Sequence, residues 1–191
     1  MKKKRKTLKQ GPVNALRPIV STGTGSQISE NTQGLIFDFS FAELFHLIEC
    51  NQFLNMCENE SDFITSFLDA HNLICKLSHK SLQKELIQGR YRHCHAIDEK
   101  EKREVVEKAL YQVYKDQGQN TEDAENRVVQ LIGNERLYQL GFEGTVRLIG
   151  IETQTDVFKV LLFDFHHNLY PNQTKKEYNP KKCKFSPHKL V

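Results

Sequence analysis

Residues 144–171, GTVRLIGIETQTDVFKVLLFDFHHNLYP, hold the two segments of this chain that are richest in β-branched and aromatic residues. Segments 145–151 and 157–165 predict two strands, and the five residues between them suit a hairpin loop. Both alternating sets of side chains in the second segment are mostly apolar. A strand that is apolar on both faces is usually a central one, so 157–165 is expected inside the sheet.

Helical patterns precede this hairpin. A short apolar run at 35–39 predicts a strand, and Ser40 with Glu43 has capping-box spacing. Apolar periodicity predicts helices over about 41–56, 61–77, 81–88, 99–117 and from Thr121 to Leu140. Asp98 with Glu101 has N-cap spacing for the fourth helix, and Thr121 is the expected N-cap of the fifth. These patterns give an α+β fold, with a helical N-terminal part packed on a small antiparallel sheet formed mainly by the C-terminal third.

The length of 191 residues suits one domain with tails, and 38% hydrophobic residues exclude a wholly disordered chain. We expect a flexible basic arm at 1–34, one α+β domain at 35–171 and a basic tail at 172–191. No apolar run approaches the roughly 20 residues that cross a bilayer, so no membrane role is expected. The basic start MKKKRK does not lead into an apolar segment, which predicts a cytoplasmic protein without a signal peptide.

Positive charge gathers at the two ends of the chain. Residues 1–18 hold seven Lys and Arg and no acid, and residues 172–191 hold six Lys and one Glu. Arms of this kind often contact phosphate backbones, while a solubilising tail or an aid to binding anionic membranes is the alternative. Residues 1–6 could also serve as a nuclear import signal in a eukaryotic host or virus.

Five cysteines, an odd number without a CxxC pair, indicate a reducing compartment. Cys50, Cys57 and Cys75 lie in apolar segments that suit helices, and they are expected in the core. Cys183 also begins the short stretch Cys183–Phe185, which could add an edge strand. Neither a metal site nor another cofactor is expected, although Cys183 and His188 could in principle join His93-Cys94-His95 around zinc.

The first candidate site is the loop RYRHCH at residues 90–95. Its side chains suit phosphate binding and proton transfer near neutral pH, with Arg90 and Arg92 as expected nucleic-acid contacts. The alternative is a polar loop whose histidines bond to backbone.

The second candidate site is the segment FDFHHNLYP at 163–171, which follows the expected central strand. Asp164 could orient His166, and His166, His167 or Tyr170 could then transfer protons. The alternative is a turn, because Asp and Asn end strands well.

The third candidate is a cationic sheet face. Arg147 alternates with Val146 and Leu148, so it is expected to point away from the face that they bury, with Lys159 beside it on the partner strand. Lysines of the tail would extend this surface for RNA phosphates, with Tyr170 and Tyr178 stacking on bases. The expected contacts in the tail are Lys175, Lys176, Lys181, Lys182 and Lys184.

Residues 144–171 resemble the C-terminal hairpin of a poorly characterised bacterial protein group that carries a comparable Asp-x-x-His-x-Leu-Tyr-Pro text. That group also has an Arg-Cys-His-Pro-Ile-like element, matched here by residues 93–97 except at Ala96, where the Pro is absent. The hairpin is also loosely similar to toxins of the RelE/ParE superfamily. This resemblance implies an RNA-cleaving or RNA-binding protein, with Arg147 in a strand position comparable to that of a RelE-like catalytic residue.

These observations predict an RNA-directed protein of a bacterial toxin or phage-defence system, with metal-independent RNA cleavage as a further hypothesis. RNA is favoured over DNA as the partner, and a protein partner or antitoxin is a second expected partner. The alternative is a non-enzymatic nucleic-acid-binding subunit of a larger defence or phage complex, whose basic arms order on binding.

Overall fold

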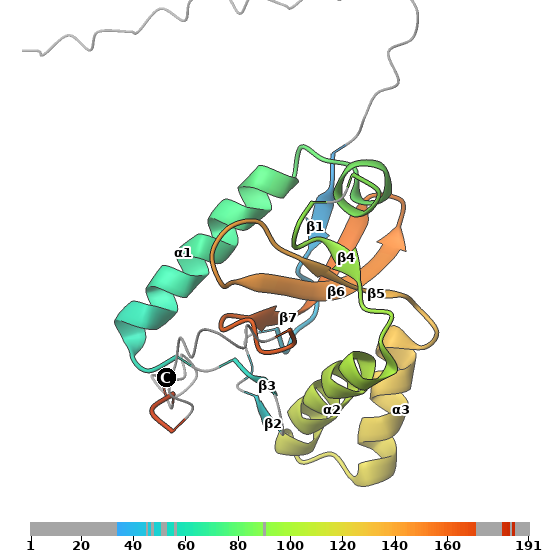
Figure 1. The fold of residues 1–191 in the computed structure, drawn as a ribbon. Helices are drawn as coiled ribbons and strands as arrows, with labels where there is room; N and C mark the ends of the chain where they lie inside the picture. Colours follow the sequence, from blue (N-terminus) through green and yellow to red (C-terminus); the bar gives the residue numbers. More distant parts are fainter. Residues whose placement is uncertain are drawn as a thin grey trace, which may run out of the picture. The chain divides into compact units, whose positions relative to one another are not determined.

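Strand β7 (Val157–Asp164) lies inside a five-stranded sheet whose order is β1-β7-β6-β5-β4 (Figure 1). The computed structural model describes residues 34–44, 46, 48–50, 53–55, 57–89, 91–170, 181–183 and 185. All of them belong to the unit that spans residues 32–191. The other strands of the sheet are β1 (Ile36–Asp38), β4 (His95–Ala96), β5 (Leu137–Leu140) and β6 (Arg147–Gln154).

The sheet confirms the α+β fold and the inner position of the second hairpin strand, and it is mixed where an antiparallel sheet was expected. Strand β1 pairs with β7 in the parallel direction, while the β7–β6, β6–β5 and β5–β4 pairs are antiparallel. Phe158 and Phe163 are almost fully buried, as the apolar character of both faces of β7 requires.

The loop between β6 and β7 is shorter than expected, because β6 continues to Gln154. Only Thr155 and Asp156 form the turn, and Asp156 adopts a left-handed backbone conformation with φ 57°. The Asp156 carboxylate accepts hydrogen bonds from Ser81 Oγ (3.0 Å) and the Leu82 amide (2.7 Å). The turn therefore caps the short π-helix η1 (Leu82–Ile87).

The other helices lie close to their predicted positions, at α1 (Glu60–Leu77), α2 (Lys100–Asp116) and α3 (Thr121–Ile132). In Figure 1, α1 lies to the left of the sheet, and α2 and α3 pack together at its lower right. Side chains of Asn59 and Asn120 cap α1 and α3 by accepting amide hydrogen bonds. The expected caps at Asp98 and Thr121 are wrong: Asp98 pairs with Arg136 (2.6 Å), and Thr121 is already helical.

Two predicted helical stretches are wrong. Within 41–56, strands β2 (Glu49–Cys50) and β3 (Phe53–Leu54) form a small hairpin that contacts α2. The Asn55 side chain closes it, because its Oδ1 accepts from the Ile48 amide (2.8 Å) and its Nδ2 donates to the His46 carbonyl (3.1 Å).

The second error concerns residues 135–140. Gly133 ends α3 with φ 42°, and Leu137–Leu140 then form strand β5 between β6 and β4. All four residues of β5 are buried, so an apolar run that suits a helix face equally suits this inner strand.

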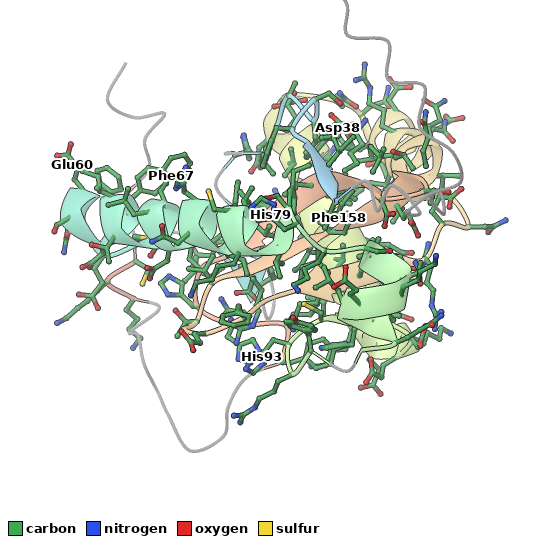
Figure 2. The ribbon with its side chains drawn as sticks, turned by 90° about the horizontal axis from the view of Figure 1, so that it is seen from above. Asp38, Glu60, Phe67, His79, His93 and Phe158 are labelled. Atoms are coloured by element: carbon green, nitrogen blue, oxygen red, sulfur yellow. The ribbon has the colours of Figure 1, made fainter. Side chains whose placement is uncertain are left out.

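No two of the five cysteines form a disulfide. Cys57 is buried and Cys50 is half-buried, but Cys75 lies on the exposed face of α1, contrary to expectation. Helix α1 instead packs through Ala70, Leu73 and Leu77, and its outer face carries the exposed Phe67 (Figure 2).

Near the C-terminus, Phe185 makes one isolated antiparallel bridge to Cys57, in place of the edge strand expected at Cys183–Phe185. Among the described residues, no helix is both long and apolar enough to cross a membrane. The predicted arm at 1–34 and tail at 172–191 lie largely outside the described residues.

Candidate functional site

The loop before β4 and the turn after β7 come together in the structure, although they are far apart in the sequence. The His93 and His167 rings meet edge to face, with centroids 6.0 Å apart and planes at 87°. Two residues after His93 and three residues after His167, the His95 and Tyr170 rings also meet edge to face, with centroids 4.8 Å apart. The first two sequence candidates therefore form one site. His93 lies at a surface of the described unit, on the side away from Asp38 (Figure 2).

The turn after β7 is built on the carboxylate of Asp164, which is fully buried. It accepts hydrogen bonds from the backbone amides of His166 (3.3 Å), Asn168 (2.8 Å) and Leu169 (3.0 Å). Burial raises the pKa of Asp164, and these hydrogen bonds act in the opposite direction. Asp164 thus organises the backbone that carries the histidines.

This turn holds His167 in a left-handed conformation with φ 56°. A non-glycine residue adopts that conformation at a cost, and such residues often occur at functional sites. The neighbouring Asn168 side chain donates to the Leu54 carbonyl (2.8 Å), which ties the turn to the β2–β3 hairpin. The His167 backbone is therefore fixed on both sides of the turn.

Arg147 lies beneath the site rather than on a solvated sheet face. It is 2% exposed, and its Nη1 donates to the carbonyls of Gly144 and Val146, both at 2.8 Å. The expected position beside Lys159 is wrong. In the register of β6 and β7, Arg147 lies opposite Asp164, whereas Lys159 lies opposite Ile151 further along the strands.

Gly141 is what lets the Arg147 side chain reach the site. A Cβ atom at Gly141 would overlap the Arg147 side chain and lie 2.9 Å from His93 Cβ. The guanidinium therefore packs closely under His93. Burial lowers the pKa of His93, and the nearby charges of Arg147, Arg92 and His95 lower it further. His93 is thus favoured in its neutral form, which can accept a proton at neutral pH.

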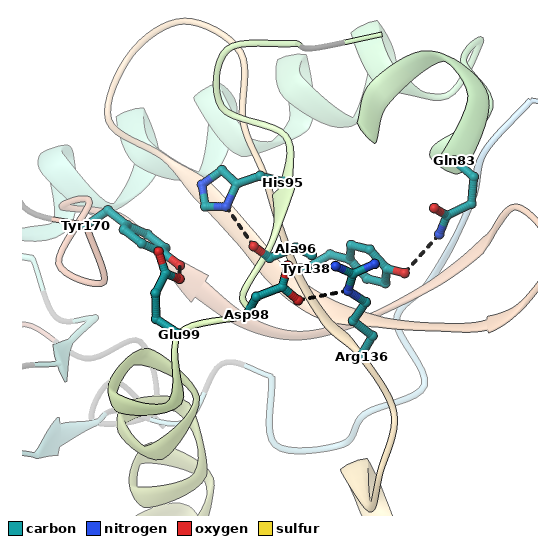
Figure 3. Close-up of polar contacts among 8 residues, drawn as sticks. All are labelled: Gln83, His95, Ala96, Asp98, Glu99, Arg136, Tyr138 and Tyr170. Atoms are coloured by element: carbon teal, nitrogen blue, oxygen red, sulfur yellow. Dashed lines mark hydrogen bonds and ion pairs between the residues drawn. The ribbon is translucent and has the colours of Figure 1, made fainter. Parts of the chain in front are cut away.

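Hydrogen bonds fix the ring of His95. Its Nδ1 faces the Ala96 carbonyl (3.0 Å), so Nδ1 carries the proton, and its Nε2 accepts from the Gln139 amide (3.2 Å). Gln139 is buried, and its Oε1 has no hydrogen-bond partner among the described residues. The contact from His95 to Ala96 is drawn in Figure 3.

Tyr170 donates its hydroxyl proton to Glu99 Oε2 at 2.6 Å, as Figure 3 shows. Burial and the Glu99 carboxylate raise the pKa of Tyr170 far above its ordinary value, and the same hydrogen bond lowers the pKa of Glu99. Tyr170 is therefore held in its protonated form with its ring beside His95, and proton transfer by Tyr170 stays a prediction.

A protein-family profile described as "Uncharacterised protein UU032" matches residues 40–191. The chain belongs to this family. No curated protein and no solved structure matches the chain. The region matched to UU032 contains both halves of the site, from the loop before β4 to the turn after β7. The RelE/ParE likeness remains a prediction.

The remaining candidates of this UU032-family chain separate into three groups. Arg92 is exposed next to His93, and Lys181 and Lys182 are exposed near the C-terminus. Lys159 lies away from the histidines. Outside the described residues lie Arg90, Lys175, Lys176 and Lys184.

Sequence reasoning missed Glu99, Gln139 and Gly141. Gly141 directly follows the helix predicted to end at Leu140, and a glycine between Leu140 and Phe142 could have marked a close approach of other atoms. Within the described part of the chain, no group of three or more His, Cys, Asp and Glu side chains could hold a metal ion.

Proposed function

We propose that this protein cleaves single-stranded RNA by acid–base catalysis with His93 and His167, without a metal ion. The observation that supports it most is the edge-to-face pairing of these two partly exposed imidazoles at 6.0 Å. Two imidazoles at this separation can act on different oxygens of one phosphodiester. The exposed Arg92 lies beside them and supplies positive charge to the phosphate.

In the proposed reaction, neutral His93 accepts the proton of a ribose 2′-hydroxyl. The 2′-oxygen attacks phosphorus, and the bond from phosphorus to the 5′-oxygen of the next nucleotide breaks. Protonated His167 gives its proton to that leaving oxygen, so the products are a 2′,3′-cyclic phosphate and a 5′-hydroxyl. Arg92 stabilises the charge that develops on the phosphate oxygens.

The buried groups support this chemistry indirectly. Arg147, packed under Gly141, helps to keep His93 neutral. Asp164 holds the turn that presents His167, and the pair Tyr170–Glu99 holds the neighbouring His95. Removing any one of these groups should disturb the positions of the imidazoles without removing a reacting atom.

RNA is the proposed partner rather than DNA, because the reaction needs the 2′-hydroxyl as its nucleophile. The basic segments 1–18 and 172–191 would bind the RNA backbone through phosphate contacts that are sensitive to salt. A place in a toxin or phage-defence system, with a cognate protein partner, belongs to the same proposal.

The test uses the full chain with end-labelled single-stranded RNA, on native and denaturing gels, with and without EDTA. We expect cleavage in EDTA that falls about 100-fold or more in His93→Ala and in His167→Ala. His79→Ala is the matched control, because His79 is exposed just after α1 and away from His93 (Figure 2). A substrate with one 2′-deoxy position should resist cleavage there.

Three results would overturn the proposal: activity that needs a metal ion, normal cleavage by both histidine variants, or RNA that is never shortened. Binding without cleavage would favour the alternative, a nucleic-acid-binding subunit. The fold of each variant is checked by circular dichroism, so that a loss of cleavage can be assigned to the missing imidazole.

A further inference from the structure

A pocket of about 400 Å³ opens beside His93. It lies between the loop before β4 and the loop that joins β5 to β6. Its lining residues are Tyr91, Arg92, His93, Gly141, Phe142, Glu143 and Gly144. Small-molecule sites usually measure about 300–1,000 Å³, so this pocket can hold a single nucleotide.

We propose that this pocket binds one nucleobase of the RNA and that Glu143 makes it prefer guanine. The inference deepens the proposed function and rests on it. It identifies the base next to the bond that is cleaved, whereas the reaction proposed above makes no distinction among bases.

Aromatic side chains give the pocket a surface for stacking. The Tyr91 and Phe142 rings are half-buried, with centroids 6.2 Å apart and planes tilted by 40°. Proteins that bind unpaired RNA stack its bases on aromatic rings of this kind. A base that binds here would stack on one of these two rings rather than between them.

Two lysines add positive charge around these rings. Lys76 Nζ lies 4.7 Å from the centroid of Phe142, and Lys80 Nζ lies 5.9 Å from that of Tyr91. Lys76 also lies 3.6 Å from Glu143 and Lys80 lies 3.4 Å from Glu85, so each lysine shares its charge with a carboxylate, and Arg92 adds a further cation that suits a phosphate-bearing ligand. An uncharged apolar ligand would gain nothing from them.

Glu143 supplies the selectivity. Its side chain is largely exposed at the pocket, where Lys76 Nζ lies 3.6 Å from its Oε2. A carboxylate has two acceptor oxygens, and guanine alone presents two adjacent donors, N1–H and the N2 amino group, that match them. Adenine, cytosine and uracil each offer a carboxylate one donor group on that edge. A guanine on the pocket therefore gains a paired, charge-assisted hydrogen bond to Glu143 that the other three bases lack.

The backbone leaves this pocket open to a ligand. Gly144 has φ 75°, and a Cβ atom built there would meet nothing within 4 Å. At the inner end, Gly141 packs against Arg147 and His93. A base on Phe142 therefore brings its own ribose and phosphate close to His93, which lines the same pocket and contacts His167. Cleavage is expected next to guanosine.

Binding of mononucleotides tests the pocket independently of catalysis. Isothermal titration of the full chain with 3′-GMP, 3′-AMP, 3′-CMP and 3′-UMP should show 3′-GMP binding about tenfold more tightly than the others. Glu143→Gln should remove most of this preference, because an amide offers one acceptor, while binding of 3′-AMP stays unchanged. Phe142→Leu should weaken all four ligands, since it keeps an apolar side chain but loses the ring. Glu135→Gln, an exposed glutamate outside the pocket, is the control.

Equal affinities for the four nucleotides, or an unchanged preference in Glu143→Gln, would overturn the inference. The two proposals fail in different ways. Guanine-selective binding without RNA cleavage would keep this pocket and remove the ribonuclease. Cleavage at all bases alike, with no nucleotide preference, would keep the ribonuclease and remove the guanine pocket.

Discussion

The two ends of β7 each lead into a turn that is organised by an aspartate. At one end, Asp156 accepts hydrogen bonds from Ser81 and Leu82 and so joins the β6–β7 turn to η1. At the other end, Asp164 accepts three backbone amides of the turn that follows β7. Both turns also contain one non-glycine residue in the left-handed region.

The difference lies in which residue adopts that conformation. In the first turn it is Asp156 itself, whose side chain is directed to the fold through its own hydrogen bonds. In the second turn it is His167, whose imidazole meets the His93 ring edge to face. A similar local arrangement therefore closes a hairpin at one end of β7 and places the His167 imidazole beside His93 at the other.

The largest expected effect on stability is that of removing the Asp164 carboxylate from the turn after β7. Asp164→Ala leaves three backbone amides without their acceptor, two of them in buried contacts. Each unsatisfied buried group costs about 1–3 kcal/mol, so we expect a loss of about 3–5 kcal/mol in unfolding free energy. Chemical denaturation measures it. Asp164→Asn, which keeps one acceptor oxygen, should lose less. Equal stability of the alanine variant and the parent chain would contradict the role given to this carboxylate.

The stability of the β6–β7 turn should fall less when its aspartate, Asp156, is removed. Asp156→Ala removes a partly exposed cap, and loss of a helix cap costs about 1–2 kcal/mol. RNA cleavage should remain at the level of the parent chain, because Asp156 is at the far end of β7 from the histidines. A loss of activity greater than the loss of folded protein would show that the two ends of the strand are coupled.

Substitution of the left-handed residue by glycine should change stability in opposite directions in the two turns. His167→Gly relieves the left-handed strain and should raise stability by about 0.5–1 kcal/mol while abolishing cleavage. Asp156→Gly relieves similar strain but loses two hydrogen bonds, so it should lower stability. Thermal unfolding of the two variants side by side makes the comparison, and destabilisation in both would mean that the His167 ring also supports the turn.

The smallest expected effect is a shift in a pH profile. The pKa of His93 lies below its ordinary value of 6.5, so the fold favours the neutral ring. The unfolded chain then binds more protons, and stability that is present above about pH 6.5 is lost as the pH falls.

The activity of the proposed base follows the same direction. The acid limb of kcat/KM should lie below pH 6.5, and Arg92→Ala, which removes one of the nearby charges, should move that limb to higher pH. An acid limb at the same pH in Arg92→Ala and in the parent chain would show that the Arg92 charge does not lower the pKa of His93.

The strand β7 was predictable because both of its faces are apolar, a pattern that few structures other than an inner strand produce. Residues 41–56 misled the periodicity argument. Their turn depends on the Asn55 side chain, which bonds to Ile48 and His46, and an apolar pattern does not reveal such a bond. Helix and strand also compete closely for a short apolar run such as Leu137–Leu140.

Each half of the site was recognisable in the sequence as an unusual polar segment, but the contact between the two halves was not predicted. His93 reaches His167 because β4 is added to the sheet through β5, a strand that the sequence pattern had placed in a helix. Arg147 was expected to be exposed because alternation distinguishes two faces of a strand without showing that both are covered. The candidate side chains could be recognised from short sequence segments, whereas their contact depends on the order of the strands in the sheet.

The parallel pairing of β1 with β7 also affects the time at which the protein can finish folding. Ile36 lies opposite Val157, so a strand made early in translation waits for a partner made much later. Contacts between such distant segments form slowly, because a long loop must close first. While the ribosome is still synthesising the intervening helices, the apolar Ile36 and Phe37 remain without their strand partner. The nascent chain should therefore be most prone to aggregation just before β7 emerges.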